Sequence, residues 1–243
     1  DGNDNIFIGG DGGDHIYGGG GNDTVSFAGA GDSVITSFTP DLNSGDAKDD
    51  LYFDIDNVTG SSHDDSLTGD EWDNILTGGE GNDYLYGLDG RDTIYADQGN
   101  DFIAHGGNGN DTIHVSSLSG NRPDKVDGGA REAGDVSTHG GNVMVLEGLD
   151  DVSHAGAYDL TDLAGVTDNI DTLDISGDGA GADVAITISA QDIQDMVDTG
   201  AELYIKADSG DSLVLDLDVL GGETSTSGAH DGHTDYTILD SGL

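Results

Sequence analysis

The chain has no cysteine, only 6 lysine and arginine residues, and no long apolar run. Proteins that bind nucleic acids hold phosphates with clustered lysine and arginine, so 50 acidic residues and a net charge of −44 exclude a nucleic-acid partner. No apolar run approaches the ~18 residues of a membrane-spanning helix, and no signal peptide is visible at the start. The absence of cysteine excludes disulfides and thiolate metal sites, and it fits an extracellular protein that folds without disulfides.

Aspartate and glycine are abundant instead, with 42 glycines and only 6 glutamates among the acidic residues. Aspartates recur every nine residues, and residues 9–17, 18–26, 78–86 and 106–114 meet the full pattern Gly-Gly-x-Gly-x-Asp-x-apolar-x. A fixed period this short indicates a solenoid, and this pattern predicts a calcium-binding parallel β-helix. The series comprises Asp4, Asp14, Asp23, Asp32, Asp41, Asp50, Asp65, Asn74, Asp83, Asp92, Asp101 and, one residue late, Asp111.

Each nonapeptide predicts a turn followed by a short strand. Because side chains alternate across a strand, the middle residue of the last three points inward and its neighbours face solvent. Glycines in the first six positions allow backbone conformations closed to residues with a Cβ, and they let the backbone approach an ion. The predicted inward residues are Ile16, Val25, Val34, Tyr52, Leu67, Leu76, Leu85, Ile94, Ile103 and Ile113.

Two nonapeptides complete one coil, so aspartates 18 residues apart lie about one strand spacing, ~4.8 Å, from each other. Like charges this close disfavour each other's ionised form, and a bound cation reverses that effect. Calcium fits because it takes about 6–8 oxygen ligands, whereas magnesium demands tighter geometry and transition metals favour thiols and paired histidines. On the order of 5–10 ions are expected, between Asp4 and Asp23, Asp14 and Asp32, Asp23 and Asp41, Asp32 and Asp50, Asp65 and Asp83, Asp83 and Asp101, Asn74 and Asp92, and Asp92 and Asp111.

Some segments depart from the repeat. The turn before Asp41 has no glycine, and Asn74 replaces an aspartate, so we expect weakened sites at both. Residues 42–64 loosen the repeat, with a strand at 51–53 and a bulge or loop at 54–58. Two roll blocks, roughly 1–53 and 60–114, are expected to stack continuously, and His105 is a one-residue insertion that predicts a local bulge.

Over residues 1–127 the nonapeptides resemble those of the repeats-in-toxin (RTX) family. The resemblance implies a right-handed parallel β-roll in a protein that a Gram-negative bacterium exports through a type I secretion system. It also implies that backbone carbonyls of the first four turn residues complete the calcium ligands. The turn residues so implied are Gly9, Gly10, Asp11, Gly12, Gly18, Gly19, Gly21, Gly78, Gly79, Glu80, Gly81, Gly87, Asp89, Gly90, Gly106, Gly107 and Gly109.

Strands of another type follow in the second half, at residues 143–146, 172–175, 184–188, 203–205 and 213–217, with a short helix starting at Ser189. A solenoid needs a cap over its last exposed sheet edge. The fold class is therefore all-β, a roll over 1–127 and a β-rich cap over 128–243. Residues 171–175, 186–193, 203–215 and 235–239 resemble the C-terminal end of giant type I-secreted adhesins, which implies a place next to the secretion signal.

Catalytic motifs do not support an enzyme. Residues 210–213 read Gly-Asp-Ser-Leu, but no Asp-x-x-His follows them. Neither Gly-x-Ser-x-Gly nor His-Glu-x-x-His occurs anywhere in the chain. The many close carboxylate pairs are expected to bind calcium, so we predict no enzymatic activity.

With 34% hydrophobic residues and a charge of −44, the repeat half is expected to stay disordered until calcium binding supplies the free energy of folding. We therefore expect a calcium-dependent folding module at the C-terminal end of a type I-secreted adhesin, on the surface of a Gram-negative cell. The chain starts inside a repeat, which predicts a fragment of a longer protein, monomeric in isolation. The alternative is the secretion module of an RTX exoenzyme, a protease, lipase or epimerase, whose catalytic domain lies upstream.

Overall fold

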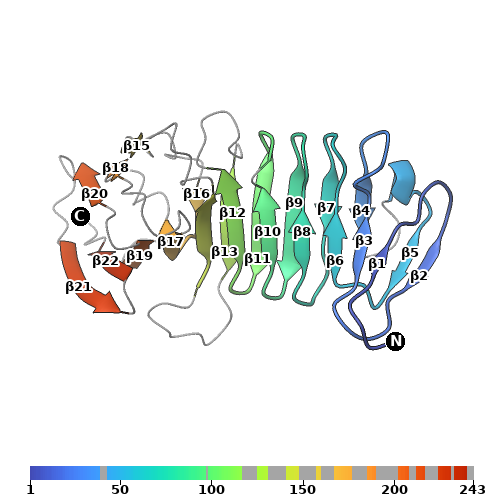
Figure 1. Cartoon of the computed structure of the whole chain (residues 1–243), viewed down its shortest axis with the longest axis horizontal. Helices are drawn as coiled ribbons and strands as arrows, with labels where there is room; N and C mark the ends of the chain where they lie inside the picture. Colours follow the sequence, from blue (N-terminus) through green and yellow to red (C-terminus); the bar gives the residue numbers. More distant parts are fainter. Residues whose placement is uncertain are drawn as a thin grey trace.

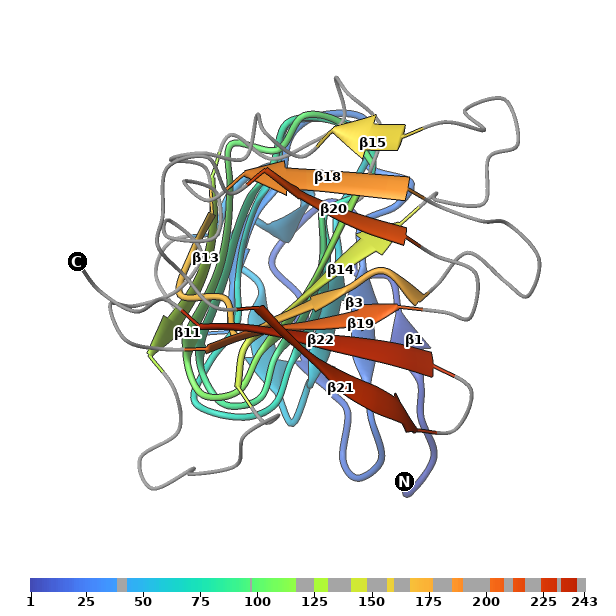
Figure 2. The same ribbon diagram turned by 90° about the vertical axis from the view of Figure 1, so that its left-hand side faces the viewer.

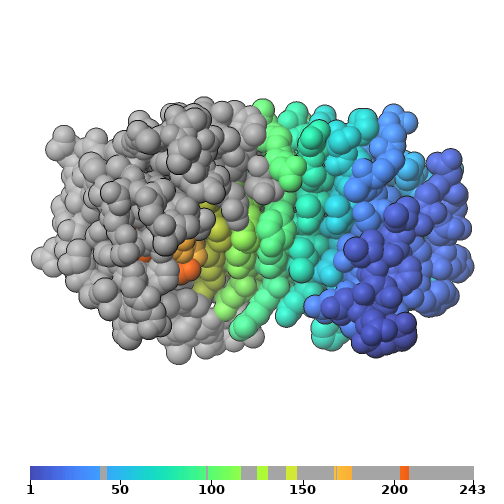
Figure 3. Space-filling model, in the orientation of Figure 1, coloured from blue at the N-terminus to red at the C-terminus, as the bar shows by residue number. Residues whose placement is uncertain are grey.

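The computed structural model shows an elongated stack of coils whose strands lie across the long axis (Figure 1). Seen along that axis, the coils superimpose (Figure 2), and successive coils form parallel bands on the surface (Figure 3). The structure describes residues 1–38, 43–96, 98–116, 125–130, 141–147, 157–159, 167–176, 185–189, 202–207, 212–216, 224–230 and 233–239.

An 11-stranded sheet runs the length of the molecule. Its strand pairs are parallel as far as β19, and the last two pairs, β19 with β22 and β22 with β21, are antiparallel. We call it the long sheet. In spatial order it contains β1 (Ile6–Phe7), β3 (Thr24–Ser26), β6 (Asn57–Thr59), β8 (Ile75–Thr77), β10 (Thr93–Ala96), β12 (Thr112–Ser116), β14 (Val143–Glu147), β17 (Thr172–Asp174), β19 (Glu202–Ala207), β22 (His233–Leu239) and β21 (Thr224–His230).

Three smaller sheets, all parallel, complete the fold. The 6-stranded sheet contains β16 (Thr167–Asp168), β13 (Val126–Ala130), β11 (Ile103–Asn108), β9 (Tyr84–Asp89), β7 (Ser66–Thr68) and β4 (Ile35–Ser37). The others are β2 (His15–Tyr17) with β5 (Leu51–Phe53), and β15 (Ala157–Asp159) with β18 (Ala185–Ser189) and β20 (Ser212–Asp216). The predicted all-β parallel roll is confirmed.

Apolar side chains in register fill the space between the sheets. In the long sheet Val25 pairs with Val58, Val58 with Leu76, and so on through Ile94 and Ile113, and all five side chains are buried. Full burial of one such side chain stabilises the fold by about 1.5–3 kcal/mol. Burial confirms the predicted inward residues Ile16, Val25, Val34, Leu67, Leu76, Leu85, Ile94 and Ile113.

The prediction that Ile103 points inward is wrong. Ala104 is the buried residue and pairs with Leu85, whereas Ile103 pairs with Tyr84. The carbonyl of Asp83 accepts hydrogen bonds from both Phe102 N–H (2.8 Å) and Ile103 N–H (3.3 Å), the mark of a bulge. The extra residue therefore lies at the start of β11 and not at His105. Tyr52, also predicted inward, is only half-buried.

The interruption changes the order in which strands stack. β4 pairs with β7, while a bridge from Ile35 to Ser44 and a 3-10 turn (Gly45–Ala47) return the chain to β5, which pairs with β2. Residues 57 and 58 belong to the bulge or loop predicted at 54–58, but they instead lie in β6, between β3 and β8. The reason is that Val58 fills the interior at this level. The two roll blocks thus stack continuously along the long sheet.

The long sheet does not stop at residue 127, since β14, β17 and β19 continue it in parallel. The antiparallel strands β22 and β21 then cover its last parallel edge. The strands predicted in the second half all occur, within one or two residues. Ser189 ends β18, and the helix predicted from there falls on residues 190–201, outside the described part. Within the described part, no helix has the length and apolarity to cross a membrane.

Replacing Leu76 with alanine should lower the free energy of unfolding by about 2–5 kcal/mol, because it leaves a cavity at a site with no solvent exposure. The matched control is Ile75→Ala in the same strand, where the side chain is 39% exposed. Urea unfolding in saturating calcium measures both variants. An Ile75→Ala loss as large as that of Leu76→Ala would contradict the assignment of inward and outward positions.

Candidate metal sites in the turns

Each turn ends in a side chain that is tied to the coil before it. Oδ1 of Asp83, for example, accepts a hydrogen bond from the main-chain N–H of Asp65 at 2.8 Å. Such side chains form two rows, which we call ladders. The first ladder precedes strands of the long sheet, and the second precedes strands of the 6-stranded and 2-stranded sheets.

Among the described residues, the first ladder contains eight side chains and the second five. Bonds of 2.8–2.9 Å connect the first, which consists of Asn5, Asp23, Asp56, Asn74, Asp92, Asp111, Asn142 and Asp171. Asn74 is joined to the preceding coil differently, through its Nδ2 and the Asp56 carbonyl. Bonds of 2.7–3.0 Å connect the second, which consists of Asp14 with Asp50, and of Asp65, Asp83 and Asp101. At the end of this row the main-chain N–H of Val34 donates to Asp65 Oδ1 at 2.7 Å.

The structure brings together the pairs predicted in the regular part of the repeat. These are Asp65 with Asp83, Asp83 with Asp101, Asn74 with Asp92, and Asp92 with Asp111. The pairs predicted around Asp32 are wrong. Asp14 faces Asp50, 36 residues away, because the interruption carries β4 to another level, and Asp32 is exposed outside both ladders. Asp41 lies outside the described residues.

The pair of Asp4 with Asp23 is also wrong. Asn5 occupies the ladder position, and its N–H donates to Asp23 Oδ1 at 2.9 Å. Asp4 lies one residue earlier and accepts a hydrogen bond from the N–H of Asn22 instead. The partner of Asp23 on its other side is Asp56, whose Oδ2 accepts from the N–H of Asp23.

Sequence reasoning therefore missed four ladder residues: Asn5, Asp56, Asn142 and Asp171. A signal was available for the last two, since Asn142-Val143-Met144 and Asp171-Thr172-Leu173 repeat the order of a polar ladder residue, any residue and an apolar one. Their distances of 31 and 29 residues from the previous ladder residue hid them from a search at nine-residue steps.

Several ladder aspartates keep one buried oxygen, Oδ2, that accepts no hydrogen bond from the described residues. In Asp23, Asp83, Asp92 and Asp111 the other oxygen, Oδ1, accepts a ladder bond. A buried acceptor left unsatisfied costs about 1–3 kcal/mol, and more when it is charged. These orphaned oxygens belong to Asp14, Asp23, Asp83, Asp92 and Asp111.

The first glycine of the turn leaves open the space that these oxygens face. A Cβ added to Gly106 would clash with Asp111 Oδ2 and come within 2.6 Å of the carbonyl oxygen of Gly128, one coil further on. At Gly87 the same added atom would clash with Asp92 Oδ2 and with the Gly106 carbonyl oxygen. A carboxylate oxygen and a carbonyl oxygen thus converge at one point, which is a donor set that suits a hard cation. Added Cβ atoms at Gly18 and Gly78 would likewise clash with Oδ2 of Asp23 and Asp83, and at Gly9 the contact with Asp14 Oδ2 is 3.2 Å.

The remaining predicted turn residues offer main-chain oxygens at most. The side chains of Asp11, Glu80 and Asp89 are exposed and do not enter the ladders. The turn needs the left-handed backbone region at its second and fourth positions, as at Gly79 (φ 103°) and Gly81 (φ 127°). Gly10, Gly12, Gly19, Gly21, Gly90, Gly107 and Gly109 share this conformation.

Burial raises the pKa of Asp83 to about 8, of Asp92 to about 7 and of Asp111 to about 6. The charged form of each loses hydration, and neighbouring aspartates add repulsion. A bound divalent cation inverts this effect, because it favours the charged form. Burial of the charged carboxylates therefore destabilises this fold when no ion is bound, and a bound cation removes that cost.

Calcium fits this arrangement. Within the described part of the chain, no three histidine, aspartate or glutamate side chains gather around one point, so main-chain carbonyls must supply part of any ligand set. Calcium accepts mixed carboxylate and carbonyl oxygens in flexible geometry, whereas magnesium demands a near-ideal octahedron. When bound, calcium would supply the positive charge that the orphaned oxygens lack.

Comparison with protein families agrees with this geometry. Residues 1–35, 73–103 and 104–117 match the RTX calcium-binding nonapeptide repeat, in 4 copies. The chain thus carries an RTX repeat region, for which calcium binding is implied. No curated protein matches the chain.

Gly106→Ala should reduce both calcium affinity and stability, because the methyl group would enter the space shared by Asp111 Oδ2 and the Gly128 carbonyl. We expect a loss of at least tenfold in affinity for the site at Asp111, measured by calorimetric titration. Gly29→Ala is the control, since an added Cβ there has no neighbour within 4 Å. Equal calcium affinities of the two variants would show that the space between Asp111 Oδ2 and the Gly128 carbonyl does not bind the ion.

Without calcium, folding should be favoured by acid. The pKa values of Asp83, Asp92 and Asp111 lie above the ordinary 3.8, so the folded state binds more protons than the unfolded state between about pH 4 and 8. Stability is therefore present at the lower pH and is lost as the pH rises. Far-UV circular dichroism in chelator should show more β structure at pH 5 than at pH 8, with a smaller difference in Asp83→Asn. The reverse order would refute the burial of these carboxylates.

Proposed function

We propose that this chain is a calcium-dependent folding module at the C-terminal end of a type I-secreted cell-surface adhesin. The observation that carries the proposal is the row of buried, unsatisfied Oδ2 atoms at Asp14, Asp23, Asp83, Asp92 and Asp111. A fold that places carboxylates against carbonyl oxygens in this way is unfavourable until cations occupy the space between them. The RTX repeat region supports the identification of that cation as calcium.

The net charge of −44 couples the ions to folding of the whole roll. Mutual repulsion opposes a compact state without cations, and each bound ion removes part of it. Because the sites exist only when two coils are stacked, the free energy of binding becomes free energy of folding. The module is disordered where calcium is scarce and folded where it is plentiful.

This coupling suits export. Extracellular calcium modules have dissociation constants of about 10⁻⁴–10⁻³ M, far above the free calcium inside a cell. The chain remains unfolded in the cytoplasm and can thread a secretion channel. Calcium outside the cell then folds the emerging coils, and the folded coils hinder backward movement. The type I secretion machinery is the partner during this step.

The adhesin assignment rests on the second half of the chain. Its strands β17, β18, β19, β20 and β22 coincide with the segments that resemble the end of secreted adhesins. The antiparallel pair β22 and β21 supports a capping role for this region. The alternative is the secretion module of an RTX exoenzyme, which a catalytic domain upstream would favour.

We propose that the chain itself is not an enzyme. Ser212 of the Gly-Asp-Ser-Leu segment begins β20 and pairs with Ala185 of β18, so it belongs to a regular parallel strand pair. The ladder carboxylates have the role of calcium ligands. Binding of the adhesin to its target is assigned to regions outside this chain.

Titration of the purified chain with calcium tests the proposal. We expect a cooperative gain of β structure in far-UV circular dichroism, with a decrease in hydrodynamic radius, at sub-millimolar to millimolar calcium. The variant Asp83→Asn/Asp92→Asn/Asp111→Asn should bind fewer ions and change the calcium dependence of folding. Magnesium at equal concentration is the control cation. A chain already compact in chelator at neutral pH would reduce calcium to a stabilising ligand and refute the export mechanism.

A further inference from the structure

Two asparagines occupy positions in the first ladder where other coils have aspartate. Asn142 is fully buried and Asn74 is 2% exposed. Both belong to the same row as Asp92 and Asp111. An asparagine differs from an aspartate in having no charge and in carrying two N–H donors in place of one oxygen.

Asn142 reproduces the geometry of Asp111 atom by atom. Its Oδ1 accepts the N–H of Asp111 at 2.9 Å, as Asp111 Oδ1 accepts the N–H of Asp92. Its Nδ2 lies 2.6 Å from a Cβ added to Gly128, and Asp111 Oδ2 has the matching place at Gly106. The amide nitrogen therefore stands where the orphaned carboxylate oxygen stands one coil earlier.

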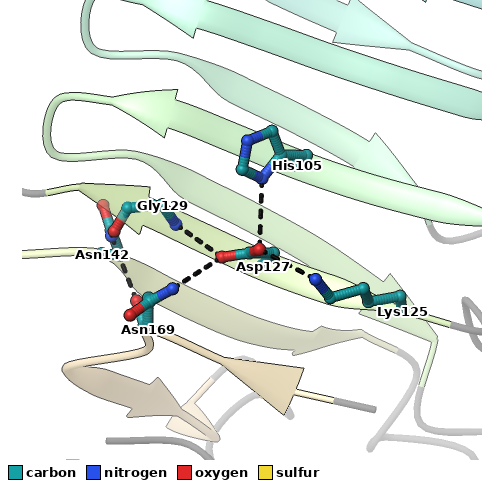
Figure 4. Close-up of polar contacts among 6 residues, drawn as sticks. All are labelled: His105, Lys125, Asp127, Gly129, Asn142 and Asn169. Atoms are coloured by element: carbon teal, nitrogen blue, oxygen red, sulfur yellow. Dashed lines mark hydrogen bonds and ion pairs between the residues drawn. The ribbon is translucent and has the colours of Figure 1, made fainter. Parts of the chain in front are cut away.

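The difference lies in what this atom contacts. Nδ2 of Asn142 donates to the carbonyl oxygens of Gly129 and Asn169, each at 3.1 Å (Figure 4). The carbonyl of Asn169 is held in place by its own side chain, which donates to Asp127 Oδ1 at 2.8 Å. Asp127 also accepts from Lys125 Nζ and Gly129 N–H, each at 3.0 Å. No polar atom of the Asn142 amide is left for an ion to satisfy.

Asn74 is also satisfied, but its amide has the opposite orientation. Its Oδ1 and not its Nδ2 lies beside the first glycine of the turn, where a Cβ added to Gly69 would clash with Oδ1 and come within 2.6 Å of the Gly87 carbonyl oxygen. Its Nδ2 donates to the carbonyl oxygen of Asp56 at 3.0 Å and to Asp70 Oδ1 at 3.3 Å, and its Oδ1 accepts the N–H of Asp70 at 2.8 Å. The second residue of this turn is Asp70, which does not adopt the positive φ of Gly79 and Gly107. The main-chain N–H of Asp70 therefore reaches the Asn74 amide, and this turn lacks the positive φ found at the second position of the turns of Asp83 and Asp111.

We propose that the amide groups of Asn74 and Asn142 take the place of calcium, so that these two coils are closed without an ion. The inference rests on calcium binding by the aspartate coils and goes beyond it. At Asn142 two N–H groups bring partial positive charge to converging carbonyl oxygens, as a cation would. At Asn74 the oxygen beside the turn glycine carries no net charge and accepts the N–H of Asp70, so no cation is needed to balance it. The expectation of a weakened calcium site at Asn74 is thereby replaced by the absence of one.

The position of these coils gives them a role. Asn74 lies between the orphaned aspartates of the first two coils and those at residues 83–111. Asp65 in the neighbouring turn is also satisfied internally, by Ser61 N–H at 2.5 Å and Ser61 Oγ at 3.0 Å. Asn142 lies where the repeats give way to the second half. The roll therefore contains turns that close without an ion at its centre and at its junction, beside turns that need calcium.

Asn142→Asp tests the proposal. The new carboxylate would face two carbonyl oxygens, so the variant should bind an additional calcium ion per chain, counted by mass spectrometry of metals after gel filtration. It should also need a higher calcium concentration to fold than the unchanged protein, because an ion must then replace the amide. Asn74→Asp is a second, independent variant with the same expectation. Gln98→Glu adds the same charge at an exposed residue in the third position of its turn, as at Glu80, and should change neither quantity.

The converse variant Asp111→Asn should bind fewer ions and fold at a lower calcium concentration, since its amide would face the Gly128 carbonyl. Unchanged ion counts in Asn142→Asp and Asn74→Asp, with calcium still bound by the unchanged protein, would overturn this inference alone. Failure of both variants to fold in excess calcium would overturn it too, because an ion could then not replace the amide. An unchanged protein that binds no calcium would instead overturn the proposed function.

Discussion

The fold depends on the contact between a buried carboxylate and a carbonyl oxygen of the next coil. At Asp92 and Asp111 both atoms face the space that a glycine leaves open, and no protein donor reaches the second carboxylate oxygen. Two acceptors that converge in a buried place repel each other. Burial also removes hydration from the charged form and so raises the pKa of both aspartates. Only positive charge resolves this conflict, whether it comes from a calcium ion or from the N–H groups of an amide such as that of Asn142.

The apolar interior and the turns answer different needs. Buried residues such as Leu76 and Ile94 align successive coils in register, but each coil contributes only a short strand and few apolar atoms. The ladder bonds from main-chain N–H to aspartate lock the turns to the same register. The apolar residues and the ladder bonds thus hold the same coils together. Loss of the ions weakens the ladders, and the apolar interior alone cannot maintain the stacking. Folding and calcium binding should therefore be coupled.

Prediction from sequence succeeded where the period is unbroken. Between residues 60 and 114 the alternation of aspartate and apolar residues identified the ladder pairs and nearly all inward side chains. It failed at Ile103, where one extra residue forms a bulge, and at Asp32, where an excursion moves a strand to another level. Asn142 and Asp171 were missed because long connections, whose length no local rule predicts, separate them from the repeats.

The sequence by itself determined the class of fold, the turn chemistry and the oxygen donor set that suits calcium, because each of these follows from the nonapeptide and its repetition at a fixed spacing. Only the tertiary structure decided which side chains face each other. A coil can contain extra residues between two strands, and the chain can still return to the same ladder. The tertiary structure also decided that an asparagine such as Asn142 closes its turn without an ion. That outcome depends on carbonyl groups contributed by other coils, at Gly129 and Asn169, and those cannot be located from the residues of a single repeat.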